Sequence, residues 1–166
     1  YARRDSVALI AFRGKAADVL LPPTRSLARV KRSLAALPGG GGTPLASATE
    51  CAASLADAAR RKGQTPAIVF LTDGKANIAR DGAASRQRAT DDALAAARAL
   101  RASGLACIVI DTSPRPAEQS RAFAAEMATQ RYFGHSSPNG STLVDRLRAS
   151  GYRFRVAAEN IANGQQ

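Results

Sequence analysis

The hydrophobic pattern of this chain divides into short unbroken apolar runs and longer stretches with helical spacing. Three apolar runs lack polar alternation and lie at residues 6–12, 67–71 and 105–110. Runs of this kind are typical of strands that are buried on both faces of a helix-covered parallel sheet. The run at 67–71 ends in Thr72-Asp73-Gly74, which places a carboxylate at the carboxyl end of a predicted strand.

Between these runs, apolar residues recur three or four positions apart, as they do on one face of a helix. Ser26 or Thr24 is placed to cap the first predicted helix. Thr43 is placed to cap the second, with Pro44 at its first position. The predicted helices are residues 27–37, 44–62, 86–102 and 118–130, with a short one at 143–149.

The residues Arg13-Gly14-Lys15 connect the first apolar run to a second short strand at 17–21, which Pro22-Pro23 ends. Since so short a link cannot carry a parallel crossover, the two strands should form an antiparallel hairpin. The order of strands and helices therefore predicts a doubly wound α/β sheet, mostly parallel, with one antiparallel hairpin. A half-exposed strand is predicted at 152–156.

The net charge of +11 raises the question of nucleic acid, but its distribution argues against it. The charge is +9 over residues 1–116 and +2 over residues 117–166, without interleaved aromatic residues. We therefore expect duplex DNA binding to be weak and to vanish at physiological salt, and an acidic protein partner is the better expectation. No apolar run is long enough for a membrane helix, and no export leader is visible. A start without Met indicates missing upstream sequence.

Few residues carry recognisable chemistry. Cys51 and Cys107 have no metal-ligand spacing and are expected to be buried free thiols in a reducing compartment. The run GGGGTPL lacks the lysine and hydroxyl residue of a P-loop, and no dinucleotide motif follows a strand. Thr43 and Asp73 remain, at the edge where α/β sheets bind ligands. Hydroxyl and carboxylate oxygens are ligands that Mg²⁺ prefers.

The motifs SVALIAFRG, LPGGGGTPLA, FLTDGKANIARDG and VIDTSPRP closely resemble the von Willebrand factor type A domain of magnesium chelatase D subunits, over roughly residues 1–127. The resemblance implies a Rossmann-like, three-layer α/β/α fold and a cytoplasmic location. It implies that Thr43 and Asp73 are the second and third elements of a metal-ion-dependent adhesion site. Such a domain is not catalytic. It binds partner subunits, here the chelatase ATPase subunit of bacteriochlorophyll synthesis, through Mg²⁺.

The chain departs from this family at its start, because the first metal element, Asp-x-Ser-x-Ser, belongs to a strand that precedes SVALIAF. The resemblance therefore implies that the central strand is missing and the metal site incomplete, so that Mg²⁺ should bind with millimolar or weaker affinity. We expect residues 6–12 to pair directly with residues 66–71 to avoid two open strand edges. The alternatives are that the strand at 152–156 inserts between them, or that a second chain supplies the pairing.

The end of the chain, RYFGHSSPNGSTLVDRLRASGYRF and AENIANGQ, resembles the bacterial CAP superfamily of cysteine-rich secretory proteins over about residues 118–166. His135 and Glu159 match two members of that family's His/Glu cleft, and Ala158 replaces its usual glycine. For His135 alone, a histidine in a surface loop is the favoured interpretation, because two ligands without a third rarely hold a metal. The sequence thus predicts two domains, 1–117 and 118–166. Two alternatives remain for the function: the chain is a secreted CAP-type module, or it is a chimera in which neither site is functional.

Overall fold

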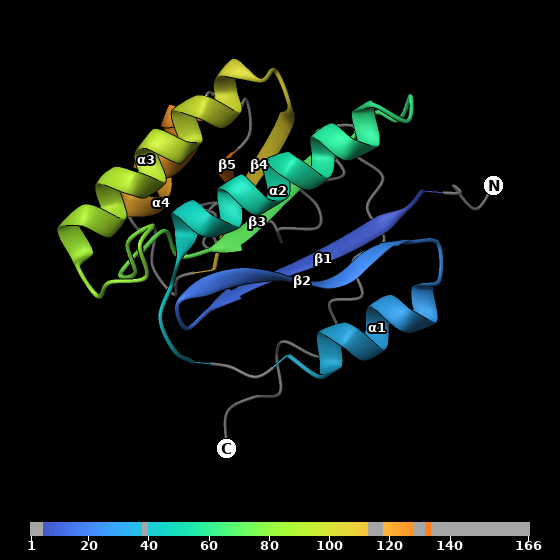
Figure 1. Ribbon diagram of the computed structural model, residues 1–166, viewed down its shortest axis with the longest axis horizontal. Helices are drawn as coiled ribbons and strands as arrows, with labels where there is room; N and C mark the ends of the chain where they lie inside the picture. The colour runs from blue at the N-terminus through green and yellow to red at the C-terminus, as the bar shows by residue number, and fades with distance from the viewer. Residues whose placement is uncertain (1–4, 38–39, 113–117, 128–131, 134–166) are drawn as a thin grey trace, which may run out of the picture.

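The computed structural model describes residues 5–37, 40–112, 118–127 and 132–133 (Figure 1). Strands and helices alternate as the hydrophobic pattern predicts, apart from the initial hairpin. The strands are β1 (Val7–Arg13), β2 (Ala16–Thr24), β3 (Ala67–Thr72), β4 (Ala106–Asp111) and β5 (Tyr132–Phe133). The helices are α1 (Leu27–Ala35), α2 (Leu45–Arg60), α3 (Arg86–Ala102) and α4 (Glu118–Glu126).

The antiparallel hairpin of β1 and β2 confirms the prediction from its short connection. Gly14 adopts φ +68° in the turn, and the pairing runs from Arg13 opposite Ala16 to Val7 opposite Thr24. The predicted end of the second strand before Pro22 is wrong, because β2 continues through both prolines. A strand with an open edge tolerates proline, whose missing N–H is not needed for pairing on that side.

The two caps predicted from sequence have opposite outcomes. Ser26 caps α1, since its hydroxyl accepts a hydrogen bond from the N–H of Arg29 at 3.4 Å. The predicted cap of α2 by Thr43 is wrong: Pro44 occupies the N-cap position, and no side chain caps the helix. The N–H of Thr43 is instead bonded to a loop that follows β3, as described below.

The main core lies between the β3–β4 sheet and one layer of helices. β3 and β4 are parallel, with Val69 opposite Ile108 and Thr72 opposite Asp111, and β5 extends this sheet on the other side of β4. Side chains of α2, α3 and α4 form one buried cluster with the inward face of these strands. Within it, the rings of Phe70 and Phe123 pack edge to face, with their centroids 5.5 Å apart.

The opposite face of β3 is open in the described part of the chain. Val69 is 37% exposed and Leu71 is 55% exposed, while Phe70 between them is buried. The expectation of burial on both faces is therefore wrong for β3, because α2, α3 and α4 all pack on the same side. The remaining helix, α1, lies against β1 and β2 on the side away from α2 (Figure 1).

The predicted pairing of residues 6–12 with residues 66–71 is also wrong. The described strands form two separate sheets, β1–β2 and β3–β4–β5, in which β1 and β3 share no ladder. The N–H of Ala17 donates to the hydroxyl of Ser47 at 3.0 Å, which ties the hairpin to α2. Closing the sheet would move the hairpin by about one strand spacing, roughly 4.8 Å, and would break this bond. The alternative strand at 152–156 lies outside the described residues.

Helix α4 is packed into the α/β unit. Phe123 is 1% exposed and belongs to the main core, and α4 contacts both α3 and β4. The helix ends earlier than the predicted residue 130. The division of the chain at residue 117 stays a prediction, since most of the segment from 118 to 166 lies outside the described residues.

Candidate functional site

Two loops are locked together at the carboxyl end of β3. The N–H of Thr43, in the loop before α2, donates to Oδ1 of Asn77 at 2.6 Å. The N–H of Asn77, in the loop after β3, donates in return to the carbonyl oxygen of Thr43 at 3.3 Å. Thr43 is thus fixed through its backbone to the same loop that begins with Asp73, and its hydroxyl makes no hydrogen bond to the described residues.

Asp73 lies at the start of this loop with a half-exposed side chain. Its Oδ1 accepts a hydrogen bond from the N–H of Lys75 at 3.1 Å, and its Oδ2 is 3.8 Å from the Lys75 ammonium. The present contacts of Asp73 are those of a turn-forming residue. The carboxylate still has free acceptor positions and is accessible to solvent.

Gly74 brings this turn against the start of α4. The residue adopts φ +72°, which favours glycine, and a Cβ there would clash with the backbone of Ser120 and lie 2.7 Å from the Gln119 carbonyl carbon. Ser120 is fully buried, and its Oγ has no hydrogen-bond partner among the described residues. The turn that presents Asp73 is therefore supported directly by α4.

The far end of the loop is held by charges on two helices. The Arg80 guanidinium is 2.7 Å from Glu50 of α2, and the Arg80 N–H donates to Asp92 of α3 at 2.8 Å. Asp81 accepts from the N–H of Ala83 and from Arg88, and these bonds lower the pKa of Asp81. The loop is thus a fixed part of the fold rather than a loose connection.

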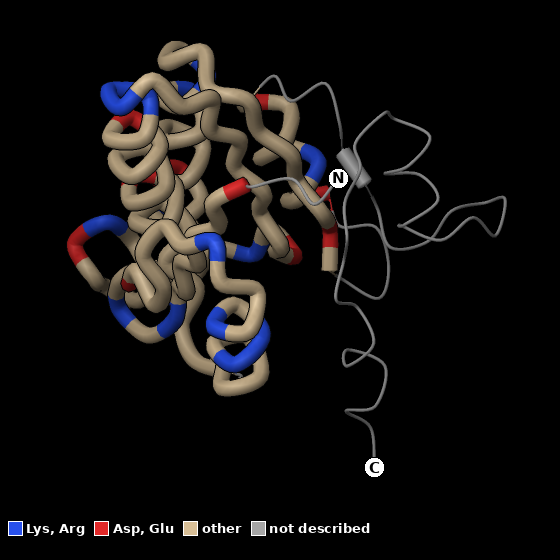
Figure 2. Tube along the Cα trace, turned by 90° about the vertical axis from the view of Figure 1, so that its right-hand side faces the viewer, with Lys and Arg blue, Asp and Glu red and all other residues tan. Residues whose placement is uncertain are grey.

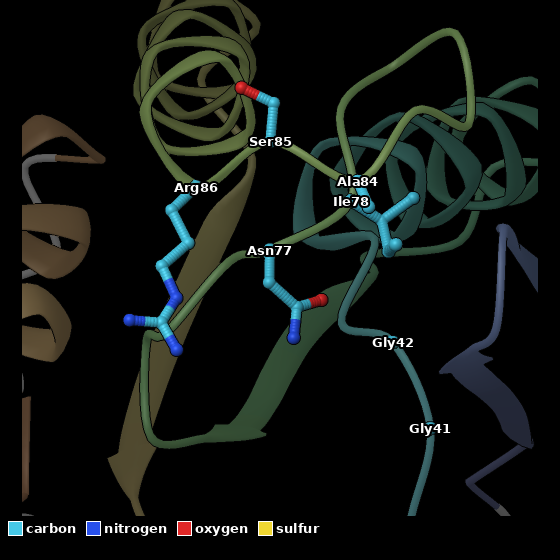
Figure 3. Close-up of a pocket in the computed structure, with 7 residues that line it drawn as sticks. All are labelled: Gly41, Gly42, Asn77, Ile78, Ala84, Ser85 and Arg86. Atoms are coloured by element: carbon cyan, nitrogen blue, oxygen red, sulfur yellow. The ribbon is translucent and has the colours of Figure 1, made fainter.

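A cavity of about 400 Å³ opens beside Thr43. Its walls come from the glycine run, the loop after β3 and the amino end of α3. Figure 3 shows the side chains of Asn77 and Arg86 pointing to the same side of the cavity. The lining residues are Gly41, Gly42, Asn77, Ile78, Ala84, Ser85 and Arg86.

The donor set at this edge fits Mg²⁺ only in part. Thr43 supplies a hydroxyl and Asp73 a carboxylate, which are suitable ligands, but the described residues contain no group of three or more His, Cys, Asp or Glu side chains that could hold a metal. Asp111 is buried at the end of β4 and is engaged in contacts there. The remaining ligands of an ion would have to be water molecules and groups from another molecule.

The other candidate residues are two pairs, His135 with Glu159 and Cys51 with Cys107. His135 and Glu159 lie outside the described residues. Cys51 and Cys107 are free thiols, as predicted, but are half-buried rather than fully buried. Burial raises the pKa of the Cys107 thiol to about 11, so it is protonated at neutral pH and is a poor nucleophile.

Comparisons with known proteins identify the fold. The sequence pattern of the von Willebrand factor type A domain matches residues 1–75. The solved von Willebrand A domain of SpRpn10 superposes with a TM-score of 0.58, at 15% identity, over 87% of this chain and 71% of that one. The fold is that of a von Willebrand factor type A domain.

Several relatives in sequence are magnesium-chelatase subunits. The 60 kDa subunit of Cereibacter sphaeroides is 55% identical over 124 residues, covering 75% of this chain and 22% of that subunit. The 60 kDa subunit of Rhodobacter capsulatus is 58% identical over 116 residues, or 70% and 21%. The 67 kDa subunit of Chlorobaculum tepidum is 44% identical over 156 residues, or 87% and 25%. The von Willebrand A domain is thus homologous to these subunits and spans about a fifth to a quarter of their length.

These comparisons give the CAP-like tail no support. An alignment that covers 87% of the chain extends beyond residue 127 wherever it begins, so chelatase similarity enters the segment that resembles a CAP protein. The secreted and chimeric alternatives likewise gain no support. No helix in the described ranges is long and apolar enough to cross a membrane.

Two features of the site were not predicted from sequence. Asn77 connects the two loops, and its only signal was its place four residues after Asp73. The second feature is the cavity beside Thr43, which Gly41 and Gly42 of the glycine run line together with Arg86. From sequence, this glycine run was tested only as a P-loop. Lys and Arg residues are otherwise spread over several segments, with Asp and Glu among them (Figure 2).

Proposed function

We propose that this von Willebrand A domain is a non-catalytic protein-interaction module of a magnesium-chelatase D-type subunit. Its contact edge is the carboxyl end of β3, and Thr43 and Asp73 are the ligands of a weakly bound Mg²⁺. The observation that carries the proposal is the reciprocal bonding of Thr43 and Asn77, which fixes the hydroxyl-bearing loop to the loop that begins with Asp73.

The chemistry of the edge supports a shared ion. Mg²⁺ dehydrates reluctantly and is often held by one or two protein oxygens, waters and groups from its binding partner. A carboxylate of another protein would complete such a site and make the contact depend on the ion. The sequence relatives are subunits by name, which agrees with a role in assembly. The partner implied by the resemblance is the chelatase ATPase subunit, in the cytoplasm.

The ion is tested first by calorimetric titration of the chain with MgCl₂. We expect millimolar or weaker affinity that disappears in Asp73→Asn. Asp91→Asn is the matched control, because Asp91 is an exposed carboxylate on α3 that accepts hydrogen bonds from the Gln87 side chain. Micromolar affinity that Asp73→Asn abolishes would show that ligands beyond Thr43 and Asp73 exist.

The interaction is tested with the purified ATPase subunit. Association measured by sedimentation should weaken when EDTA replaces Mg²⁺, and it should weaken in Thr43→Ala and recover in Thr43→Ser. Both substitutions keep the backbone bonds to Asn77, so they report on the hydroxyl alone. If the strength of association is unchanged by EDTA and in both Thr43 variants, the ion-dependent contact is refuted.

A further inference from the structure

The cavity beside Thr43 presents hydrogen-bond donors and no acid. None of its seven lining residues is acidic. The N–H groups of Gly41 and Gly42 have no hydrogen-bond partner among the described residues. Asn77 has committed its Oδ1 to Thr43, which leaves its NH₂ group to donate, and Arg86 adds a guanidinium. Such a set of donors selects an anion.

The positive charge around this cavity is not neutralised. Arg13, Lys15 and Arg86 have no ion-pair partner in the part of the chain that the structure describes. Arg13 borders the glycine run, since a Cβ on Gly41 would lie 4.0 Å from Arg13 Cβ. Lys15 follows on the same hairpin.

Two acids at this edge have basic partners. Lys75 lies beside Asp73, and Arg88 beside Asp81. Asp73 and Asp81 are therefore neutralised by their own neighbours, while Arg13, Lys15 and Arg86 are available to another molecule. We call these three residues the basic rim.

We infer that the cavity and the basic rim bind an acidic segment of a partner protein, with one Glu or Asp carboxylate in the cavity and further acids on the rim. No aromatic side chain lines the cavity, so it offers no stacking platform for a nucleobase. A guanidinium and backbone N–H groups match a carboxylate in charge and geometry. These contacts need no ion, and the inference rests on the proposed function only in taking the partner to be a protein.

The test uses the full chain and a fluorescein-labelled peptide in which glutamate alternates with serine and glycine. Its twin carries glutamine in place of glutamate. In EDTA at low ionic strength, fluorescence anisotropy should show binding of the glutamate peptide and none of the twin. Arg86→Gln should weaken binding about tenfold, as expected for one charge-assisted contact. Arg101→Gln, an exposed arginine at the opposite end of α3, is the matched control and should change little.

The outcomes separate this inference from the proposed function. Binding that survives EDTA and Asp73→Asn but falls in Arg86→Gln, Arg13→Gln and Lys15→Gln supports the cavity and the rim. If binding requires Mg²⁺ and Asp73 and its affinity is unchanged in all three rim variants, the inference is overturned, and the ion-dependent contact of the proposed function still stands. If Arg86→Gln and Arg101→Gln weaken binding equally, the attraction is due to net charge alone and the inference is overturned. The inference is also overturned if single-stranded DNA binds more strongly than the peptide and its binding depends on Arg86.

Discussion

Lys75 is the residue that most directly opposes an ion at Asp73. Its ammonium is 3.8 Å from Oδ2 of Asp73 and neutralises the carboxylate that a cation would need. The pair is exposed, so its contribution is small, about 0.2–1 kcal/mol.

We expect Lys75→Met to raise the Mg²⁺ affinity of the chain by about 1.4- to fivefold, which is the same energy expressed as a ratio of affinities. Calorimetry of the variant measures this change. Lys62→Met removes an equal charge between the end of α2 and the start of β3, whereas Asp73 follows the other end of β3, and it should leave the affinity unchanged. An affinity that falls in Lys75→Met would mean that the lysine helps to hold the ligand.

Gly74 sets the position of the Asp73 turn through two separate constraints, a left-handed backbone and contact with α4. Gly74→Ala should destabilise the chain by about 3 kcal/mol, combining left-handed strain with overpacking. Gly63→Ala is the control, because Gly63 has φ +74° with open space around it, and it should cost only about 1 kcal/mol. Urea unfolding of both variants measures the difference, and equal losses would contradict the contact with Ser120.

At the scale of elements, α4 depends on one aromatic contact. Phe123→Ala removes the edge-to-face packing on Phe70 and should cost about 3–5 kcal/mol of unfolding free energy. Because that loss could unfold a marginal domain, Phe123→Leu serves as a milder variant, with an expected loss near 1.5 kcal/mol. Leu34→Ala, on the exposed helix α1, should change stability little. Thermal unfolding followed by circular dichroism ranks the three, and a loss in Leu34→Ala equal to that in Phe123→Leu would contradict the core assignment.

Elements that local sequence determines were predicted well. Helix α3 has the predicted bounds of 86 and 102, because Ser85 caps it and Gly104 follows its end with φ +68°. The hairpin followed from a connection too short for a crossover. Asp73 was placed correctly at the end of its strand, since the end of a strand followed by Gly has a clear local signal, whereas Thr43 lies in the loop before α2 and not at the predicted cap.

The errors concern what each element contacts. Thr43 has the residue type of a cap, but a loop more than thirty residues away takes its N–H. The apolar run of β3 indicated two covered faces, yet the location of the helices in space leaves Leu71 exposed. Residues 6–12 were expected to pair with β3 because open edges are unfavourable, whereas the bond from Ala17 to Ser47 fixes the hairpin on α2. Pattern alone carries no information about such distant partners.

At the scale of the molecule, the open face of β3 and the unshared edges of β1 and β3 expose apolar surface. Exposed strand edges beside apolar side chains promote association between chains. We expect the apparent mass of the 166-residue chain in sedimentation to rise with concentration. Leu71→Lys should suppress this rise, because it places a charge on the exposed face of β3. Leu37→Lys is the control, because Leu37 is an exposed residue beyond the end of α1. If Leu37→Lys suppresses the rise in apparent mass equally, the effect is a general one of charge.

The separation of the two sheets has a consequence for how the chain opens. α2, a helix of mostly small side chains, contacts both sheets, and Ile10 and Phe12 of β1 also pack against the main core, but the two sheets share no ladder in the described part of the chain. Contiguous units with few contacts between them open as separate cooperative units. The β1–β2 hairpin with α1 forms from residues close in sequence, whereas β3 and β4 pair across a long helix. Native-state hydrogen exchange should therefore reveal two distinct opening free energies, with the amides of β1 and β2 exchanging through the lower one while β3 and β4 stay protected.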